Sequence, residues 1–112
     1  MAFCAFFNSA TDITTSFVIY QNTIKKLSSS PGKTNRIVLE TTVITHEFGH
    51  ILGLTNIGTT LQSNHEDPEH KRHCTVNTCL MFWESELGNV LGGNIPKLDA
   101  QCIADLQANG GK

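Results

Sequence analysis

Short apolar runs alternate with polar segments along the chain, and their lengths predict two strands near the N-terminus. Residues 2–7 (AFCAFF) are apolar and precede a turn-forming Asn-Ser pair, which is typical of a buried strand. Residues 14–23 are rich in β-branched and aromatic side chains and predict a second strand. Because two strands alone seldom make a stable sheet, we expect either one small α+β domain over residues 1–112 or the C-terminal part of a larger domain.

Two helices are predicted further along the chain. The first covers residues 35–53, with Thr34 or Asn35 as its N-cap and Gly53 just past its end. Several apolar side chains in its C-terminal half predict that this half is buried. They are Val43, Ile44, Phe48, Ile51 and Leu52. Pro96 is expected to open the last helix, over about residues 97–108, and residues 56–72 between the two helices lack periodicity and predict a long loop.

The composition excludes several classes of function. With 39% hydrophobic and 16% charged residues, the 112-residue chain is typical of a globular protein. A formal net charge of −2 provides no basic field for binding nucleic acid. No apolar run reaches the roughly 18 residues of a membrane span, and residues 1–7 lack the basic start of a secretion signal.

The sequence His46-Glu47-Phe48-Gly49-His50 matches the pattern H-E-x-x-H. Histidines four residues apart on a helix project from one face, so both ring nitrogens can reach a single zinc ion. Glu47 is then placed to act on water activated by the metal without being a ligand itself. The plain alternative is a pair of surface histidines on an amphipathic helix.

Residues 46–53, H-E-x-x-H-x-x-G, resemble the start of the metzincin zinc-peptidase signature. In that signature a third histidine follows three residues after the glycine, whereas this chain has Asn56 there, and an amide is a poor zinc ligand. If residues 56–72 are treated as an insertion, the remaining sequence HEFGHILGLTHCTVNTCLM is similar to the archaemetzincin pattern H-E-x-x-H-x-x-G-x-x-H-C-x4-C-x-M. The resemblance implies His73 as the third ligand, and Met81 as the Met-turn residue within residues 74–84. The plain alternative for Met81 is a core methionine that fills a gap.

Other third ligands remain open. His65 is the second choice and His70 the third, because both lie with His73 in a short histidine-rich stretch. Zinc peptidases also use carboxylates as third ligands. The acidic candidates are Glu66, Asp67 and Glu69.

The cysteines depart from the archaemetzincin pattern, which continues with a C-x-x-C that helps bind a second zinc. Here only Cys102 follows Met81, with no cysteine three residues away. We therefore expect Cys74 and Cys79 to form a short-loop disulfide, or half of an incomplete site, and Cys4 and Cys102 to pair or to lie buried.

The resemblance implies a small zincin with a short sheet, an active-site helix and a C-terminal helix. It implies a zinc-dependent endopeptidase that binds one catalytic Zn²⁺, acts on peptide or protein substrates and uses Glu47 as general base. Residues 16–22 are a candidate edge strand for an extended substrate, or an ordinary core strand, and Phe82 and Trp83 are candidates for a specificity pocket, or core. The chain also resembles bacterial cell-envelope metallopeptidases, which implies export and a secreted or membrane-tethered parent protein.

A rival interpretation is a catalytically inactive, zinc-stabilised structural or protein-binding module. Zinc sites with four protein ligands are structural, whereas catalytic sites keep one position open. The five histidines are enough for either kind of site. A disulfide-stapled domain without a metal is a weaker alternative, because it leaves the H-E-x-x-H pattern unexplained.

Overall fold

The structure, a computed structural model, describes residues 4–8, 15–28, 35–86 and 94–110. Within these ranges the protein is mostly helical. The helices are α1 (Gln21–Ser28), α2 (Arg36–Ile51), α3 (Trp83–Glu86) and α4 (Ala100–Ala108). The strands β1 (Cys4–Asn8) and β2 (Thr15–Ile19) pair antiparallel, with Cys4 opposite Ile19 and Asn8 opposite Thr15. None of the described helices has both the length and the apolar character needed to cross a bilayer.

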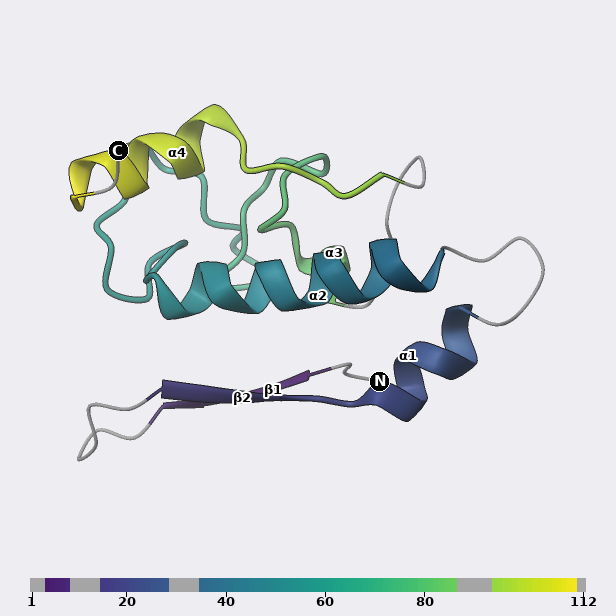
Figure 1. The fold of residues 1–112 in the computed structure, drawn as a ribbon. Helices are drawn as coiled ribbons and strands as arrows, with labels where there is room; N and C mark the ends of the chain where they lie inside the picture. The colour runs from purple at the N-terminus through teal and green to yellow at the C-terminus, as the bar shows by residue number, and fades with distance from the viewer. Residues whose placement is uncertain (1–3, 9–14, 29–34, 87–93, 111–112) are drawn as a thin grey trace.

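Helix α2 lies between two layers (Figure 1). On one side it contacts β1, β2 and α1, where Ile24, Leu39 and Val43 form a small apolar core with Ile19 packed against it. On the other side lie the loops that follow α2 in the sequence, and α4 lies beyond these loops (Figure 1). A second core fills that side and consists of Leu54, Cys74, Cys79, Met81 and Cys102. The C-terminal half of α2 therefore faces chain that comes much later in the sequence.

Local capping explains the bounds of α2. The side chain of Asn35 accepts a hydrogen bond from the backbone N–H of Ile37 at 2.8 Å, as expected for an N-cap. At the other end Gly53 has φ +86°. Its N–H donates to His50 O, and the N–H of Leu54 donates to Gly49 O. This pair of bonds is a Schellman motif, which needs a residue with positive φ where the helix stops.

Helix α1 was not predicted, because the second strand was expected to continue to residue 23. The structure ends that strand at Ile19 and starts a helix at Gln21. The helical period buries Ile24 against α2 while it leaves Lys25 and Lys26 exposed. In a continued strand, side chains would alternate between two faces, so Lys26 would lie on the same face as Ile24. The predicted strand residues 2–3 and 14 lie outside the described residues.

Helix α4 begins at Ala100 and not near residue 97. Lys97 is already engaged: it forms a parallel bridge with Cys79, and its carbonyl accepts the N–H of Leu80 at 2.9 Å. Asp99 then caps the helix by accepting the N–H of Cys102 at 2.8 Å. An aspartate is a strong N-cap, and it replaces Pro96 as the signal that starts this helix.

The C-terminal half of α2 is only partly buried, which corrects the prediction. Val43 is buried, but Phe48 and Leu52 are 52% and 55% exposed. The residues that are buried in this half are instead polar or small. They are His46, Glu47, Gly49 and His50.

Gly49 lets Met81 approach α2 closely. A Cβ atom at position 49 would lie 2.4 Å from the Sδ atom and 3.0 Å from the Cε atom of Met81, and Met81 is fully buried. Such a distance is far shorter than ordinary van der Waals contact, so a larger residue at position 49 would displace the methionine.

We expect Gly49→Ala to destabilise the protein by about 1–3 kcal/mol, the usual cost of overpacking. In a Met81→Ala background the same change should be neutral or stabilising, because alanine is the better helix former by about 1 kcal/mol. Urea unfolding of the four proteins of this cycle measures both effects. An equal cost of Gly49→Ala in both backgrounds would contradict the contact.

Candidate metal centre

Three histidines from two distant segments converge beside α2. His46 and His50 lie one turn apart on α2, and His73 follows the loop 56–72. One ring nitrogen of each lies within 4.8 Å of the other two. The rings of His46 and His73 are stacked with their centroids 5.3 Å apart. The convergence of three imidazoles makes a group that can hold a metal ion.

The spacing between His46 and His50 suits zinc. Their Nε2 atoms are 3.1 Å apart, while two nitrogens at 2.0–2.1 Å from a tetrahedral zinc lie about 3.3 Å from each other. The Nδ1 atom of His46 lies 2.8 Å from the carbonyl oxygen of Leu80. A carbonyl only accepts, so Nδ1 carries the proton and Nε2 is left as the ligand atom.

The ring of His73 is oriented by its own loop. Its Nδ1 atom lies 2.9 Å from the carbonyl oxygen of Lys71 and 3.3 Å from that of His70. These contacts make Nδ1 the protonated nitrogen, so Nε2 is the atom available to a metal. His46 and His73 thus share one arrangement, in which a backbone carbonyl fixes the tautomer.

The chain turns at positions 55 and 56, shortly after the end of α2. Thr55 and Asn56 both have positive φ, at 58° and 68°, and this conformation is unusual for a β-branched residue such as threonine. Asn56 is exposed, and its amide donates to the carboxylate of Glu66 at 3.5 Å. Asn56 is therefore not part of the histidine group, and His73 takes the third place.

The other candidates for third ligand have different partners. His65 Nε2 lies 2.7 Å from Asp105 Oδ2, and both side chains are buried. His70 stacks on Trp83 with ring centroids 4.2 Å apart and contacts Asp67 Oδ2 through Nδ1 at 3.1 Å. The pKa of Asp67 lies below its ordinary value because it accepts the backbone N–H of Glu69 and then bonds from His70.

Two of the acidic candidates, Glu66 and Asp67, are engaged within the loop as well, and the third, Glu69, is exposed. Glu66 Oε2 accepts the N–H of Arg72 at 2.9 Å. Asp67 Oδ1 accepts the N–H groups of Glu69 and His70. None of these carboxylates belongs to the group formed by the three histidines.

Glu47 lies between the two helical ligands in sequence and is 2% exposed. It is not a member of the histidine group. Glu47 is therefore a buried carboxylate next to His46 in the sequence, and it contributes no ligand atom to the histidine group.

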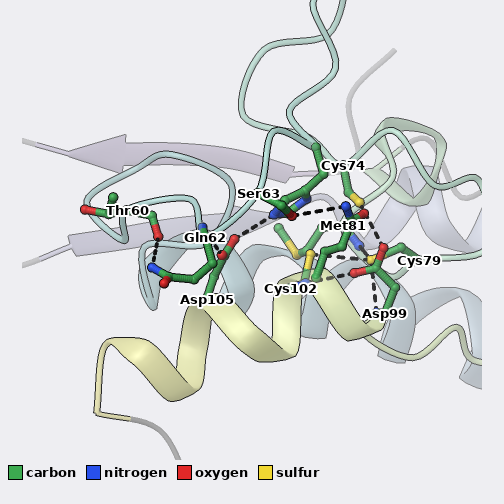
Figure 2. Close-up of polar contacts among 11 residues, drawn as sticks. Thr60, Gln62, Ser63, Cys74, Cys79, Met81, Asp99, Cys102 and Asp105 are labelled. Atoms are coloured by element: carbon green, nitrogen blue, oxygen red, sulfur yellow. Dashed lines mark hydrogen bonds and ion pairs between the residues drawn. The ribbon is translucent and has the colours of Figure 1, made fainter.

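A second group, formed by three cysteines and an aspartate, lies at the start of α4 (Figure 2). The ligand atoms of Cys74, Cys79, Asp99 and Cys102 are all within 4.8 Å of one another, and the three cysteines are buried. Cys74 Sγ donates to Asp99 Oδ2 at 3.3 Å, and the sulfurs of Cys79 and Cys102 are 3.7 Å apart. Four converging thiol and carboxylate groups can hold a metal ion.

The sulfur of Cys79 accepts most of the hydrogen bonds within this group. The backbone N–H groups of Met81 and Asp99 donate to it, each at 3.4 Å. Hydrogen bonding with the side chains of Cys102 and then Cys74 lowers the pKa of Cys79 from its ordinary value. These contacts favour the thiolate, which is the form that binds metals.

The expected disulfide between Cys74 and Cys79 is wrong for this structure, in which Cys74, Cys79 and Cys102 are free thiols. The physical reason is that Cys74 is turned to Asp99, and Cys79 accepts from the backbone and lies against Cys102. The side chain of Cys4 lies outside the described part of the chain.

Asp99 is a member of this group that the sequence pattern does not predict. It stands three residues before Cys102, at the spacing of the absent C-x-x-C, but with a carboxylate in place of a thiol. Its second role as helix N-cap also explains its position, and so a sequence pattern alone would not separate the two roles.

Comparisons with known proteins found no match to this chain among protein families, curated proteins or solved structures. The interpretation of both groups therefore depends on their own geometry.

Asp99→Asn separates the ligand role of Asp99 from its capping role, because asparagine caps helices as well as aspartate does. We expect unchanged stability without metal and roughly 10-fold or greater loss of Co²⁺ affinity at the cysteine group, since a charged ligand is lost. Titration of the thiolate-to-cobalt absorption band measures this affinity. Cys102→Ser should weaken the band, because one of its three thiols is lost, and His73→Ala should leave it unchanged. A band that depends on His73, or is indifferent to Asp99, contradicts the assignment.

Proposed function

We propose that the chain is a zinc-dependent endopeptidase of the zincin type. His46, His50 and His73 would hold the zinc ion, and Glu47 would be the general base. One observation carries the proposal: a helix with the H-E-x-x-H pattern and a histidine from a distant loop bring three ring nitrogens within 4.8 Å of one another. Three protein ligands leave one position open, as in catalytic zinc sites.

Zinc bound by these histidines would activate water at neutral pH and stabilise the negative charge that develops on the scissile carbonyl. The chain's own residues supply the remaining steps. The carboxylate of Glu47 takes the proton of the attacking water and passes it to the leaving amine. The Leu80 carbonyl keeps the proton of His46 on Nδ1, so that Nε2 stays directed to the metal.

The aromatic side chains beside the third ligand are candidates for the substrate surface. Trp83 stacks on His70 with an interplanar angle of 5°, and His70 precedes His73 by three residues. Phe82 and Trp83 are half-buried, so they offer flat apolar area to a side chain of a peptide. The predicted substrate strand at residues 16–22 is only partly a strand, since β2 ends at Ile19.

A structural, metal-stabilised module remains the second candidate, and the cysteine group favours it. Cys74, Cys79, Asp99 and Cys102 offer four ligands, which is the closed set typical of structural zinc. His46 and Glu47 are also almost completely buried. In this alternative both groups bind metal, and the protein cleaves nothing.

Glu47→Gln distinguishes the two candidates. We expect the variant to keep its histidine-bound zinc and to lose hydrolysis of an unstructured protein substrate by about 10²–10⁴-fold, because a general base contributes that much. Metal analysis and gel-based cleavage of casein measure the two quantities.

His73→Ala is the matched ligand variant and should lose both the metal and the activity, whereas His70→Ala should keep the metal. If Glu47→Gln cleaved the substrate as fast as the wild-type protein, Glu47 would not be the general base. A wild-type protein that binds zinc at the histidines but cleaves nothing would support the structural module instead.

A further inference from the structure

The loop 56–72 is tied to α4 by a buried pair. The side chains of His65 and Asp105 are both 0% exposed, with His65 Nε2 2.7 Å from Asp105 Oδ2. The other carboxylate oxygen of Asp105 accepts the backbone N–H of Gln62 at 2.7 Å. One carboxylate on α4 thus holds the loop at two points, as the position of Asp105 beside Gln62 indicates (Figure 2).

The residues after His65 are hydrogen-bonded to the segment that carries His73. The N–H of Asp67 donates to the carbonyl of His73 at 2.8 Å, and the N–H of Thr75 donates to the carbonyl of His65 at 2.9 Å. The residues between these two bonds form an antiparallel bridge. A shift of His65 therefore moves the backbone of His73.

The other polar contacts within this loop are weaker anchors. Lys71 and Glu66 lie 4.0 Å apart, with the lysine side chain 68% exposed, and such surface ion pairs contribute little. Gln101 on α4 donates to Ser63 at 3.1 Å, also in an exposed setting. Among the contacts that join this loop to α4, the pair of His65 and Asp105 is the one in which both side chains are fully buried.

We infer that the pair of His65 and Asp105 positions His73 and thereby sets the affinity of the histidine group for its metal ion. This inference rests on the proposed function, because it requires that His73 be a ligand. It gives His65 a role other than that of the third ligand. His65 and Asp105 are positioning residues, which act on the metal only through the backbone of the segment 73–75.

The test is the Zn²⁺ affinity of the double variant His65→Leu/Asp105→Leu, measured by competition with a chelator. Replacement of both members of a buried polar pair by apolar residues often preserves stability, and circular dichroism checks the fold. Zn²⁺ binding that is present in the otherwise wild-type protein and lost in His73→Ala is assigned to the histidine group. We expect the affinity of this group to fall about 10-fold or more, as for other residues that hold ligands in place.

Three single variants sharpen the comparison. His65→Gln places an amide near the position of Nε2 and should keep most of the affinity, whereas His65→Asn is too short to reach Asp105 and should lose it. Gln101→Ala removes a neighbouring bond between loop and α4 and should change nothing. If the double variant does not fold, the contrast between His65→Gln and His65→Asn decides.

Unchanged Zn²⁺ affinity in a folded double variant, or in a folded His65→Asn, would overturn the inference and would show that the pair only stabilises the fold. The proposed function would fail on a different result. If His73→Ala alone changed neither the zinc content nor the Zn²⁺ affinity of the protein, His73 would not be a ligand.

Discussion

The hydrogen bond between His46 Nδ1 and the carbonyl of Leu80 is the contact on which both candidate metal groups depend. It spans 2.8 Å and joins α2 to residues 79–81. The residue before Leu80 is Cys79, which belongs to the cysteine group, and the residue after it is Met81, which lies against Gly49. One three-residue segment therefore orients the ring of His46, supplies a cysteine of the second group and fills the space beside the helix. Loss of its placement would disturb all three.

Backbone hydrogen bonds to neighbouring segments hold residues 79–81 in position. The N–H of Leu80 donates to the carbonyl of Lys97, and the N–H of Cys74 donates to the carbonyl of Met81. Cys74 adjoins His73 in sequence, so a ligand of one group is covalently next to a ligand of the other. The two groups thus share a scaffold of short segments without regular strands, held between α2 and α4 (Figure 1). Metal bound to such a scaffold would add stability that the small apolar cores do not supply alone.

The sequence predicted best what is decided locally. Asn35 and Gly53 mark the ends of α2 through caps that involve only neighbouring residues, and the paired histidines follow from the helical period. Contacts between distant residues were out of reach. His73 was chosen through a resemblance, and nothing local reveals that Thr55 and Asn56 turn the chain aside with positive φ. Asp99 was overlooked, and a disulfide was expected where free thiols lie, because the cysteine group is assembled from three separate segments.

The central claim is that His46, His50 and His73 form a three-ligand zinc site with an open position. X-ray absorption at the zinc edge tests it most directly when Cys74, Cys79 and Cys102 are all replaced by serine, so that the cysteine group keeps no thiol and the histidine group is measured alone. The account predicts a shell of three imidazole nitrogens and one further light atom at about 2.0–2.1 Å, and the loss of one imidazole on His73→Ala. A shell that contains sulfur, or four imidazoles, or that is unchanged by His73→Ala, would contradict it.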